Sequence, residues 1–525
     1  MNRQNSRIYA TQRGGFQHRA RTTMHSPYSG ASNKTSLENW LVSSGDADSE
    51  ILSSQKMLRD RSRDLVRNAP AATGALKTMV DGVIGSGLRF QSAIDKDYIN
   101  ISDEQAIEWQ DKTQQEFRLW SESSECDFQR RLDFGGLQRL AFQEKFISGD
   151  CFVLLPYKER PMMPYDLRVQ LIEAERVSNP DDGADSDKIR GGIEYDKDGV
   201  PIAIHIRSSH PGTDFLSASG GMATWKRVPF YGANTGRKNV LHLMDKNRIG
   251  QSRGVGALAP VIYTIKQITK FSEAELQAAI TNALLSVFVE RPLEDTLTGS
   301  VDYYKDRNDN PITPPWEHPN NKFMLGNGSW VDFAPGEKAR IAESVRPSAQ
   351  YDPFFLACIK QIGMALGIPF EVLIKHFSSS YSASRAAMLD FFRTIMIERT
   401  NFVNQFCQPI YEEWLLEATI KGRIRAPGYL TNPMSKLSYS GAYFIGSGMP
   451  QIDEVKEVTA AEKRINAGLS TKQIESSKLV GMDYRDIVKA QAEEKRLAEE
   501  AKLPYLTGSG MFPYEEESEQ GNKDG

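Results

Sequence analysis

Hydroxyl-bearing side chains crowd into one short segment of the sequence, which stands between two apolar helical patterns. The segment and its flanks hold eight residues that could contact a polyanion: Lys375, His376, Ser378, Ser379, Ser380, Tyr381, Ser382 and Arg385. Serine hydroxyls make weak contacts to phosphate oxygens, and each lysine or arginine that neutralises a phosphate adds affinity. These residue types fit a loop that touches nucleic acid sparsely. They also fit a flexible connector in which Arg385 pairs locally, and the residues alone favour the connector.

Aspartates in one loop form the best candidate for a metal site: Asp181, Asp182, Asp185 and Asp187. A carboxylate cluster can hold two metal ions for phosphoryl transfer. However, the N-P-D-D-G sequence is a turn signal, no apolar strand fixes the ligands, and the spacing of a calcium loop is missing. We therefore expect a solvated turn rather than a metal site.

Signatures of catalysis are missing elsewhere in the sequence. It has no G-x-x-x-x-G-K-[ST] phosphate loop, no H-E-x-x-H zinc motif and no G-x-S-x-G nucleophile elbow. His205, His210 and His242 lie near expected strands, where a structural histidine is the usual case. The widely separated cysteines are expected to be buried, reduced thiols. The sequence predicts no catalytic residue, no metal ligand and no cofactor, in a protein that is not an enzyme.

The bulk composition is that of a globular protein with several parts. The chain has 525 residues, of which 40% are hydrophobic and 25% charged. Its 64 basic and 68 acidic residues give a formal net charge of −4, whereas a protein that clamps DNA along its backbone is basic. We find no apolar run of about 18 residues for a membrane-spanning helix, and no signal-peptide core. We expect synthesis and assembly in the cytoplasm, without a membrane partner.

Both ends of the chain are predicted to be disordered. Residues 1–37 contain arginine and lysine but neither aspartate nor glutamate, and glycine, serine and threonine are frequent there. Such a basic arm could touch nucleic acid or a neighbouring subunit. Residues 504–525 are rich in glycine and glutamate and are expected to form a disordered tail.

Residues 38–254 are predicted to form a mixed α+β unit. The first helical pattern carries a basic stripe of Lys56, Arg59, Arg63 and Arg67. Helical patterns cover about 37–80, 103–122 and 134–148, strand patterns cover 83–90, 151–155, 167–172 and 240–244, and a hairpin with a D-G turn covers 193–204.

Long helices dominate the second half. Residues 255–290 contain a helical pattern of about 30 residues, which would span about 45 Å. A proline-rich, irregular part (291–345) separates it from a second helix within 346–375, and the serine-rich loop (376–382) follows. A further long helix is expected over 383–420, kinked at Pro409, within a segment that ends at 449. Residues 450–503 are again helical.

Eight segments, in this order, resemble the lambda-type family of phage portal proteins. They are E-R-V-S-N-P (175–180), G-I-E-Y-D (192–196), W-K-R-V-P-F (225–230), V-L-H-L (240–243), R-I-G-Q-S-R-G-V (248–255), E-A-E-L-Q-A-A (273–279), A-P-G-E (334–337) and Y-S-A-S-R-A-A (381–387). No single segment is specific, but the ordered set is, and it covers most of residues 40 to 500.

The resemblance implies an elongated α+β portal fold with four parts. They are a wing (38–254), a stem of two helices (255–290 and 346–375), a clip (291–345) and a helical crown (450–503), with the chain returning to the wing over 383–449. The serine-rich segment would be the loop that lines a tunnel.

The resemblance also implies a function and partners. Identical subunits would form a ring, typically dodecameric, at one vertex of a tailed-phage head, through which double-stranded DNA is packaged and ejected. Terminase, the major capsid or scaffold protein and a head-completion protein are the implied partners, and the virion is the implied location. Two alternatives stay open: a metal-dependent nucleic-acid enzyme that uses the acidic loop, and another head–tail adaptor protein.

Overall fold

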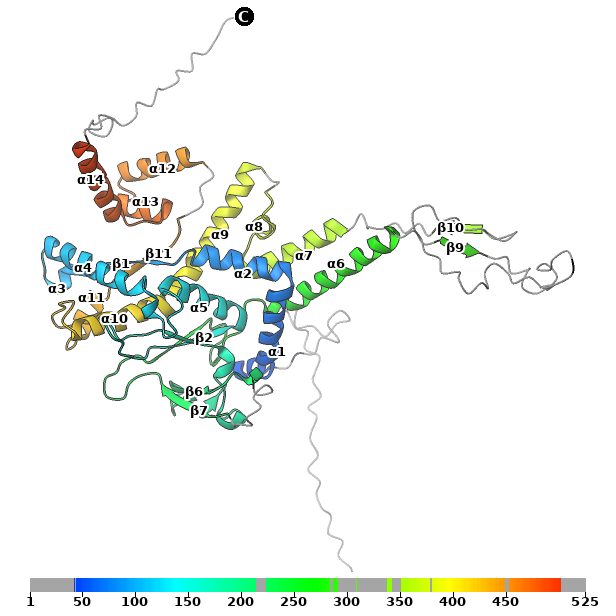
Figure 1. Cartoon of the computed structure of the whole chain (residues 1–525), viewed down its shortest axis with the longest axis horizontal. Coiled ribbons are helices and arrows are strands. Elements are labelled where there is room, and N and C mark those ends of the chain that lie inside the picture. The colour runs from blue at the N-terminus through cyan, green and yellow to red at the C-terminus, as the bar shows by residue number, and fades with distance from the viewer. Residues whose placement is uncertain are drawn as a thin grey trace, which may run out of the picture. The chain divides into compact units, whose positions relative to one another are not determined.

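A computed structural model describes residues 42, 44–213, 223–283, 287–290, 308, 338–341, 351–377, 380–448 and 453–501 (Figure 1). The chain divides into two compact units, Met1–Asp46 and Ala47–Gly525, and the second holds all the elements described below. The predicted basic arm (1–37), most of the predicted clip (291–345) and the predicted tail (504–525) lie outside the described residues. Those three assignments stay predictions.

Two helices occupy the region where the first helical pattern predicted one. α1 (Ala47–Asn68) and α2 (Pro70–Val83) are separated at Ala69, whose backbone is extended (φ −111°, ψ 113°). Pro70 has no amide hydrogen and disfavours a helical residue before it, so α1 ends and a new helix begins. The predicted strand at 83–90 is wrong over most of its length, because α2 runs to Val83 and the strand begins only at Arg89.

The helices predicted at 103–122 and 134–148 lie close to those positions, and the short helix before them was not predicted. At the start of α4, Ser102 and Gln105 form a capping box that satisfies two backbone amides. At the start of α5, the Asp133 carboxylate accepts the Gly136 N–H at 2.7 Å. Their bounds are α3 (Lys96–Ile99), α4 (Asp103–Ser121) and α5 (Phe134–Ser148).

Strands of the α+β region pair antiparallel in small sheets, in the orders β1-β11, β3-β2-β8 and β4-β5-β6-β7. The predicted D-G hairpin is present as β5 and β6, with Gly199 at φ 79° in the turn. The mixed α+β class is therefore confirmed. The bounds are β1 (Arg89–Ser92), β2 (Asp150–Leu154), β3 (Gln170–Ile172), β4 (Ile189–Arg190), β5 (Ile193–Tyr195), β6 (Pro201–Arg207), β7 (Trp225–Pro229), β8 (Val240–Met244) and β11 (Ala442–Ile445).

The helix expected over about 255–290 is shorter than predicted. After a short 3-10 turn (Ala259–Val261), α6 runs over Ile262–Ala283, which is 22 residues. The V-F-V-E sequence at its predicted end forms β9 (Val287–Glu290), paired antiparallel with β10 (Lys338–Ile341). Branched and aromatic side chains favour an extended backbone, and that preference prevails here over the helical spacing.

Helices then follow one another from residue 351 to 439. The expected kink near Pro409 is resolved as a π-helical turn, Val403–Cys407, directly before the helix that contains the proline. The wider π turn fits the missing proline N–H and its bulky ring into a continuous helical path. The bounds are α7 (Tyr351–Leu366), α8 (Phe370–Ile374), α9 (Tyr381–Phe402), α10 (Gln408–Ile420) and α11 (Pro433–Tyr439).

The predicted crown contains three described helices, α12 (Glu454–Asn466), α13 (Lys472–Leu479) and α14 (Tyr484–Glu500). Gly468 takes the left-handed conformation (φ 71°) between the first two, as the I-N-A-G-L-S sequence predicts. The cap of the next helix is Thr471.

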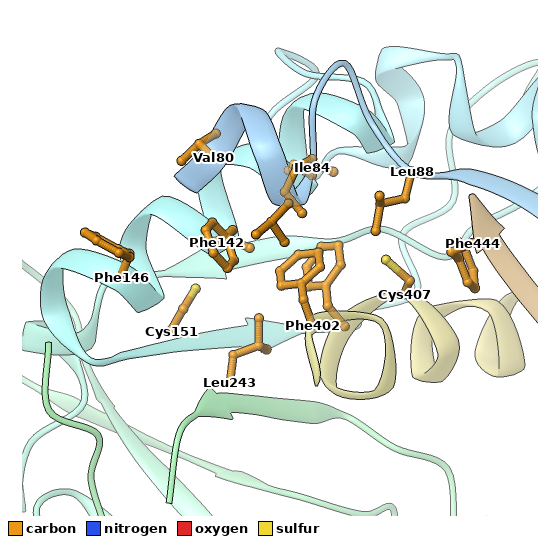
Figure 2. Packing of buried hydrophobic residues seen from close by; sticks show 14 of the residues in the cluster. Val80, Ile84, Leu88, Phe142, Phe146, Cys151, Leu243, Phe402, Cys407 and Phe444 are labelled. Carbon is orange, nitrogen blue, oxygen red and sulfur yellow. The ribbon is translucent and has the colours of Figure 1, made fainter. Parts of the chain in front are cut away.

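One hydrophobic core joins α2, α5, the β2–β8 sheet and the α9–α10 path (Figure 2). Phe402 stacks on Phe406 with ring centroids 5.1 Å apart and meets Phe142 edge-on at 5.8 Å. A second, smaller cluster lies between β2, β5 and β6. Among the described residues, none of the helices combines the length and apolar character needed to span a lipid bilayer.

Candidate functional site

The serine-rich loop is a short connection between α8 and α9. α8 ends at Lys375, which takes the left-handed conformation (φ 55°). The Ser380 hydroxyl accepts the Ala383 N–H at 3.4 Å and caps α9. The helix begins at Tyr381, so Tyr381 and Ser382 lie in its first turn, whereas the sequence prediction placed both residues in the loop. The cap explains the shift, because it satisfies an amide that would otherwise lack a partner.

The predicted site residues differ in their exposure to solvent. Lys375, His376, Ser380 and Ser382 are exposed, and so is Phe377, which the sequence prediction omitted. Ser378 and Ser379 lie outside the described residues. The described part of the loop thus presents a lysine, a histidine, the Ser380 hydroxyl and one aromatic ring.

Arg385 lies one turn into α9 and forms an ion pair with Glu457 of α12. Its side chain is partly exposed (34%), whereas that of Glu457 is largely covered (14%). The partner lies in another helix, so this is a pairing within the subunit rather than the local pairing that the residue types left open. The guanidinium joins the loop-bearing helix to the predicted crown, and its charge is already compensated within the subunit.

Buried contacts hold the two ends of the loop. Before it, Leu373 of α8 is buried in the main core, and the Ile368 N–H bonds the Gly363 carbonyl at 2.9 Å. After it, Phe391 and Ile395 of α9 are buried in the same core. A loop held at both ends in this way can project without loosening the fold.

Apolar side chains are exposed along three helices of the second half of the chain, α6, α7 and α9. An exposed, isolated apolar residue is ordinary, but an amphipathic helix normally buries its apolar stripe. The exposed side chains are Tyr263 (74%), Leu276 (60%) and Ile280 (46%) of α6, Phe354 (50%) and Met364 (81%) of α7, and Leu389 (42%), Met396 (42%) and Ile397 (57%) of α9.

Two of the four cations in the basic stripe of α1, Arg59 and Arg63, form internal ion pairs. Arg59 is buried and its Nη2 lies 2.9 Å from the Asp150 carboxylate. Arg63 bonds Glu144 at 2.7 Å and Glu175 at 3.0 Å. Burial lowers the pKa of Arg59 to about 10, even though Asp150 opposes the change. These two arginines fix α1 against α5 and β2 rather than offering charge to a polyanion.

Arg253 is a structural residue that the sequence prediction missed. It is buried, bonds the Asp150 carboxylate, and donates to the carbonyls of Ala174 (2.8 Å) and Val177 (2.9 Å). Its neighbour Gly254 lies so close to Gly149 that an added Cβ would fall 1.9 Å from the Gly149 oxygen. The signal was present in G-Q-S-R-G, since a cation between glycines suggests close backbone approach.

The acidic loop is a turn, as predicted. Asp185 accepts the side-chain amide of Asn179 at 2.9 Å and the Gly191 N–H at 2.7 Å, so it closes the loop. Asp182 lies 3.9 Å from Arg207. Within the described ranges no group of three or more His, Cys, Asp or Glu side chains could hold a metal ion.

The three histidines near strands have structural contacts, as expected. His242 stacks on Phe152 (centroids 4.2 Å apart), and its Nε2 lies 3.4 Å from Asp150. Burial lowers the pKa of His242, although the Asp150 carboxylate opposes the change. His205 lies 3.3 Å from Glu194, and His210 Nδ1 accepts the Gly212 N–H at 3.0 Å.

Comparison with known proteins assigns the family. Residues 33–399 match the family described as phage portal protein, lambda family. The portal protein of Escherichia phage N15 is 24% identical over 477 residues, which is 87% of each chain. Portal protein B of Escherichia phage lambda is 23% identical over 485 residues, again 87% of each chain. The probable portal protein of Halomonas phage phiHAP-1 is 23% identical over 476 residues, 89% of this chain and 85% of its own.

Solved structures with a similar arrangement come from the necks of gene transfer agent particles. One chain from the neck of the empty particle, computed with C6 symmetry, is 11% identical with a TM-score of 0.40 and covers 79% of this chain and 92% of its own. Another, from the neck of the native particle computed with C12 symmetry, is 11% identical with a TM-score of 0.40, and covers 81% and 98%. Because the family match spans more than half of the sequence, the chain belongs to the lambda family of phage portal proteins.

Proposed function

We propose that copies of this portal protein pack side by side into a closed dodecameric ring, and that double-stranded DNA passes through its axial opening during packaging and ejection. The observation that carries the proposal is the set of exposed apolar side chains on α6, α7 and α9. A ring of identical subunits offers each copy the same two lateral surfaces, so one set of contacts is repeated until the ring closes.

The size of the exposed set supports an interface between subunits. Burying one large apolar side chain yields about 1.5–3 kcal/mol. Met364 is 81% exposed and Tyr263 is 74% exposed, so nearly all of that free energy is unused in the single subunit. A second copy of the same helices would bury these side chains.

The loop composition suits a channel that DNA slides through. Tight binding would stall transport, because every neutralised phosphate adds affinity. Within the described residues, Lys375 supplies a single exposed lysine to the loop, while the cap residue Ser380 and Ser382 in the first turn of α9 supply hydroxyls, which make weak contacts to phosphate oxygens. Arg385 is paired with Glu457 and so adds little attraction for DNA.

The remaining assignments follow from the family. We place the ring at one vertex of the capsid in the virion, and its assembly in the host cytoplasm. Terminase, the shell protein and a head-completion protein would dock on it, and the protein would act without catalytic turnover. The acidic loop offers no support for the alternative of a metal-dependent enzyme, because Asp185 serves to close the turn.

Mass photometry and negative-stain microscopy of the purified full-length chain test the proposal. We expect particles with the mass of about twelve copies and a central opening, since a closed ring satisfies all lateral surfaces at once. Monomers that persist at high concentration, or closed particles without an axial opening, would contradict it.

A further inference from the structure

The helices α12, α13 and α14, which we call the crown helices, take no part in the main hydrophobic core. Among the described residues, that core and the side chains packed against it end at Phe444, before α12 begins. Of the apolar residues within the crown helices, only the small Ala461 and Ala498 are buried. The hydrophobic effect therefore contributes little to holding these helices against the rest of the subunit, which we call the body.

Helix α14 is held to helix α4 of the body by polar contacts. Lys489 of α14 lies 2.8 Å from Asp111 of α4, and the two side chains are 59% and 34% exposed. Arg485, one turn earlier, donates to the side-chain carbonyl of Gln110. Exposed ion pairs of this kind are weak, and dissolved salt screens them.

A polar cleft of about 960 Å³ lies beside these contacts. Asp486 and Lys489 line it from α14, and Asp111, Lys112 and Arg118 are among the side chains that line it from α4. Water and dissolved ions can enter a cleft with charged walls, whereas a packed apolar contact would exclude them. Salt therefore has access to the contacts between α14 and α4.

A third polar contact joins the crown helices to α9. Arg385, one turn into α9, forms an ion pair with Glu457 of α12. The guanidinium is partly exposed, so this pair is also open to screening. The crown helices are thus fastened by charge at two places, on α4 and on α9.

The chain enters the crown helices through a glycine-containing segment. Gly446, Ser447 and Gly448 directly follow strand β11. A Cβ atom on Gly448 would lie 2.5 Å from the Leu479 carbonyl oxygen, so two backbone segments pass close to each other there. Residues without a side chain tolerate large changes of backbone angle, which suits a hinge.

We infer that the crown helices form an electrostatically latched module. The contacts of Arg385, Arg485 and Lys489 hold the module closed, and raised ionic strength releases it while the body stays folded. The Debye length is about 10 Å at about 0.1 M salt and about 3 Å at about 1 M, so screening weakens the latch but leaves the apolar core of the body in place. All three contacts lie within one subunit, so the latch exists with or without a ring.

Double electron–electron resonance on the full-length chain tests the latch. Spin labels are attached at Leu119→Cys of α4 and Val488→Cys of α14, which are both exposed positions. Cys358→Ala removes the partly exposed native thiol, since the other three cysteines are buried. Dilution with unlabelled chain restricts the measured distances to one subunit. We expect one narrow distance at about 0.1 M NaCl and a second, longer population at about 1 M.

Removing charges from the latch should open it without added salt. Asp111→Asn with Glu457→Gln should raise the ratio of open to closed molecules about tenfold at about 0.1 M NaCl, because two partly exposed ion pairs are lost. Arg227→Gln is the matched control, since it breaks a partly exposed pair with Glu194 that lies outside the latch.

Four outcomes would overturn the inference. They are an unchanged distance at high salt, an unchanged distance in the double variant, a broad distribution in the unsubstituted chain at low salt, and an open population in Arg227→Gln. A second pair of labels, at Met57→Cys and Val200→Cys, lies on exposed positions of the body. Its distance should not respond to salt. If it does, salt loosens the whole subunit, and the crown helices are not a separate latched module.

Discussion

Asp150 is a fully buried carboxylate, and both of its oxygens accept hydrogen bonds. Arg59 and Arg253 both bond it, and the Gly254 N–H donates to it at 3.2 Å. Burial alone would raise the pKa of Asp150, but the guanidiniums of Arg253 and Arg59 hold it far below its usual range. Burying a second guanidinium beside Asp150 costs desolvation free energy. Arg253 offsets this cost by donating its other N–H groups to backbone carbonyls. The cluster thus ties helix α1, strand β2 and the G-Q-S-R-G segment into one unit.

Asp150→Asn should destabilise the subunit severely. The amide would leave two buried guanidiniums without a compensating charge, and breaking a buried pair in this way costs about 3–5 kcal/mol. Urea unfolding of the purified subunit measures the change in free energy. Arg227→Ala is the matched control, since Arg227 pairs with Glu194 at 2.6 Å but its side chain is 49% exposed, and such pairs are worth at most about 1 kcal/mol. Similar losses of unfolding free energy in both variants would show that the buried cluster stabilises the subunit no more than an exposed ion pair does.

At the scale of the element, the helical path from α9 to α10 shows what the sequence reveals and what it conceals. Its apolar spacing and Pro409 were enough to predict a long helix with a disturbance. The π turn that absorbs the proline was not predictable, because it depends on packing of Phe402 and Phe406 in the core. The start at Tyr381 was missed because the Ser380 cap is a local hydrogen bond rather than an apolar pattern.

At two other elements the sequence pattern is misleading, for different physical reasons. The V-F-V-E sequence fits a helical spacing, but pairing with β10 favours a strand. The basic stripe of α1 suggests a charged surface, yet Arg59 is buried because its partner Asp150 comes from a distant part of the chain. Periodicity in one sequence reports local preference and burial, and it cannot report which charge a distant segment supplies.

Two substitutions at Ser380 test the loop, because they separate the helix-capping role of this side chain from its contact with DNA. Ser380→Ala removes the acceptor for the Ala383 N–H and should cost about 0.5–2 kcal/mol of stability. Ser380→Asp keeps an acceptor and suits the helix N-terminus, so stability and ring assembly should persist. Its negative charge should repel phosphates, and we expect fewer DNA-filled particles in a packaging assay.

Thr471→Asp provides the control for that charge. Thr471 also caps a helix, accepting the Ile474 N–H at 3.2 Å, but it lies in the predicted crown rather than in the loop. Packaging with this variant should match that of the unsubstituted chain. If Ser380→Asp packages equally well, the loop does not meet the passing DNA.

At the scale of the whole molecule, one subunit has a continuous hydrophobic core but leaves large apolar side chains exposed on its surface. The main core is continuous from α2 to α10, so we expect the subunit to fold without its neighbours. Helices α6, α7 and α9 nevertheless expose large apolar side chains. Folding and assembly should therefore be separable. A substitution on those helices should prevent ring assembly without preventing folding of the subunit.

Met364→Glu with Ile397→Glu should separate them. Both side chains are exposed in the subunit (81% and 57%), so each substitution should change subunit stability by less than about 0.5 kcal/mol. In a ring each copy would bury two unpaired carboxylates, which is unfavourable enough to prevent closure. We expect a folded monomer with an unchanged thermal midpoint and no rings by mass photometry. Val200→Glu, at a 53% exposed hairpin position, should leave rings intact. Normal rings from the double variant would place the lateral contacts on other elements and would remove the observation on which the ring proposal rests.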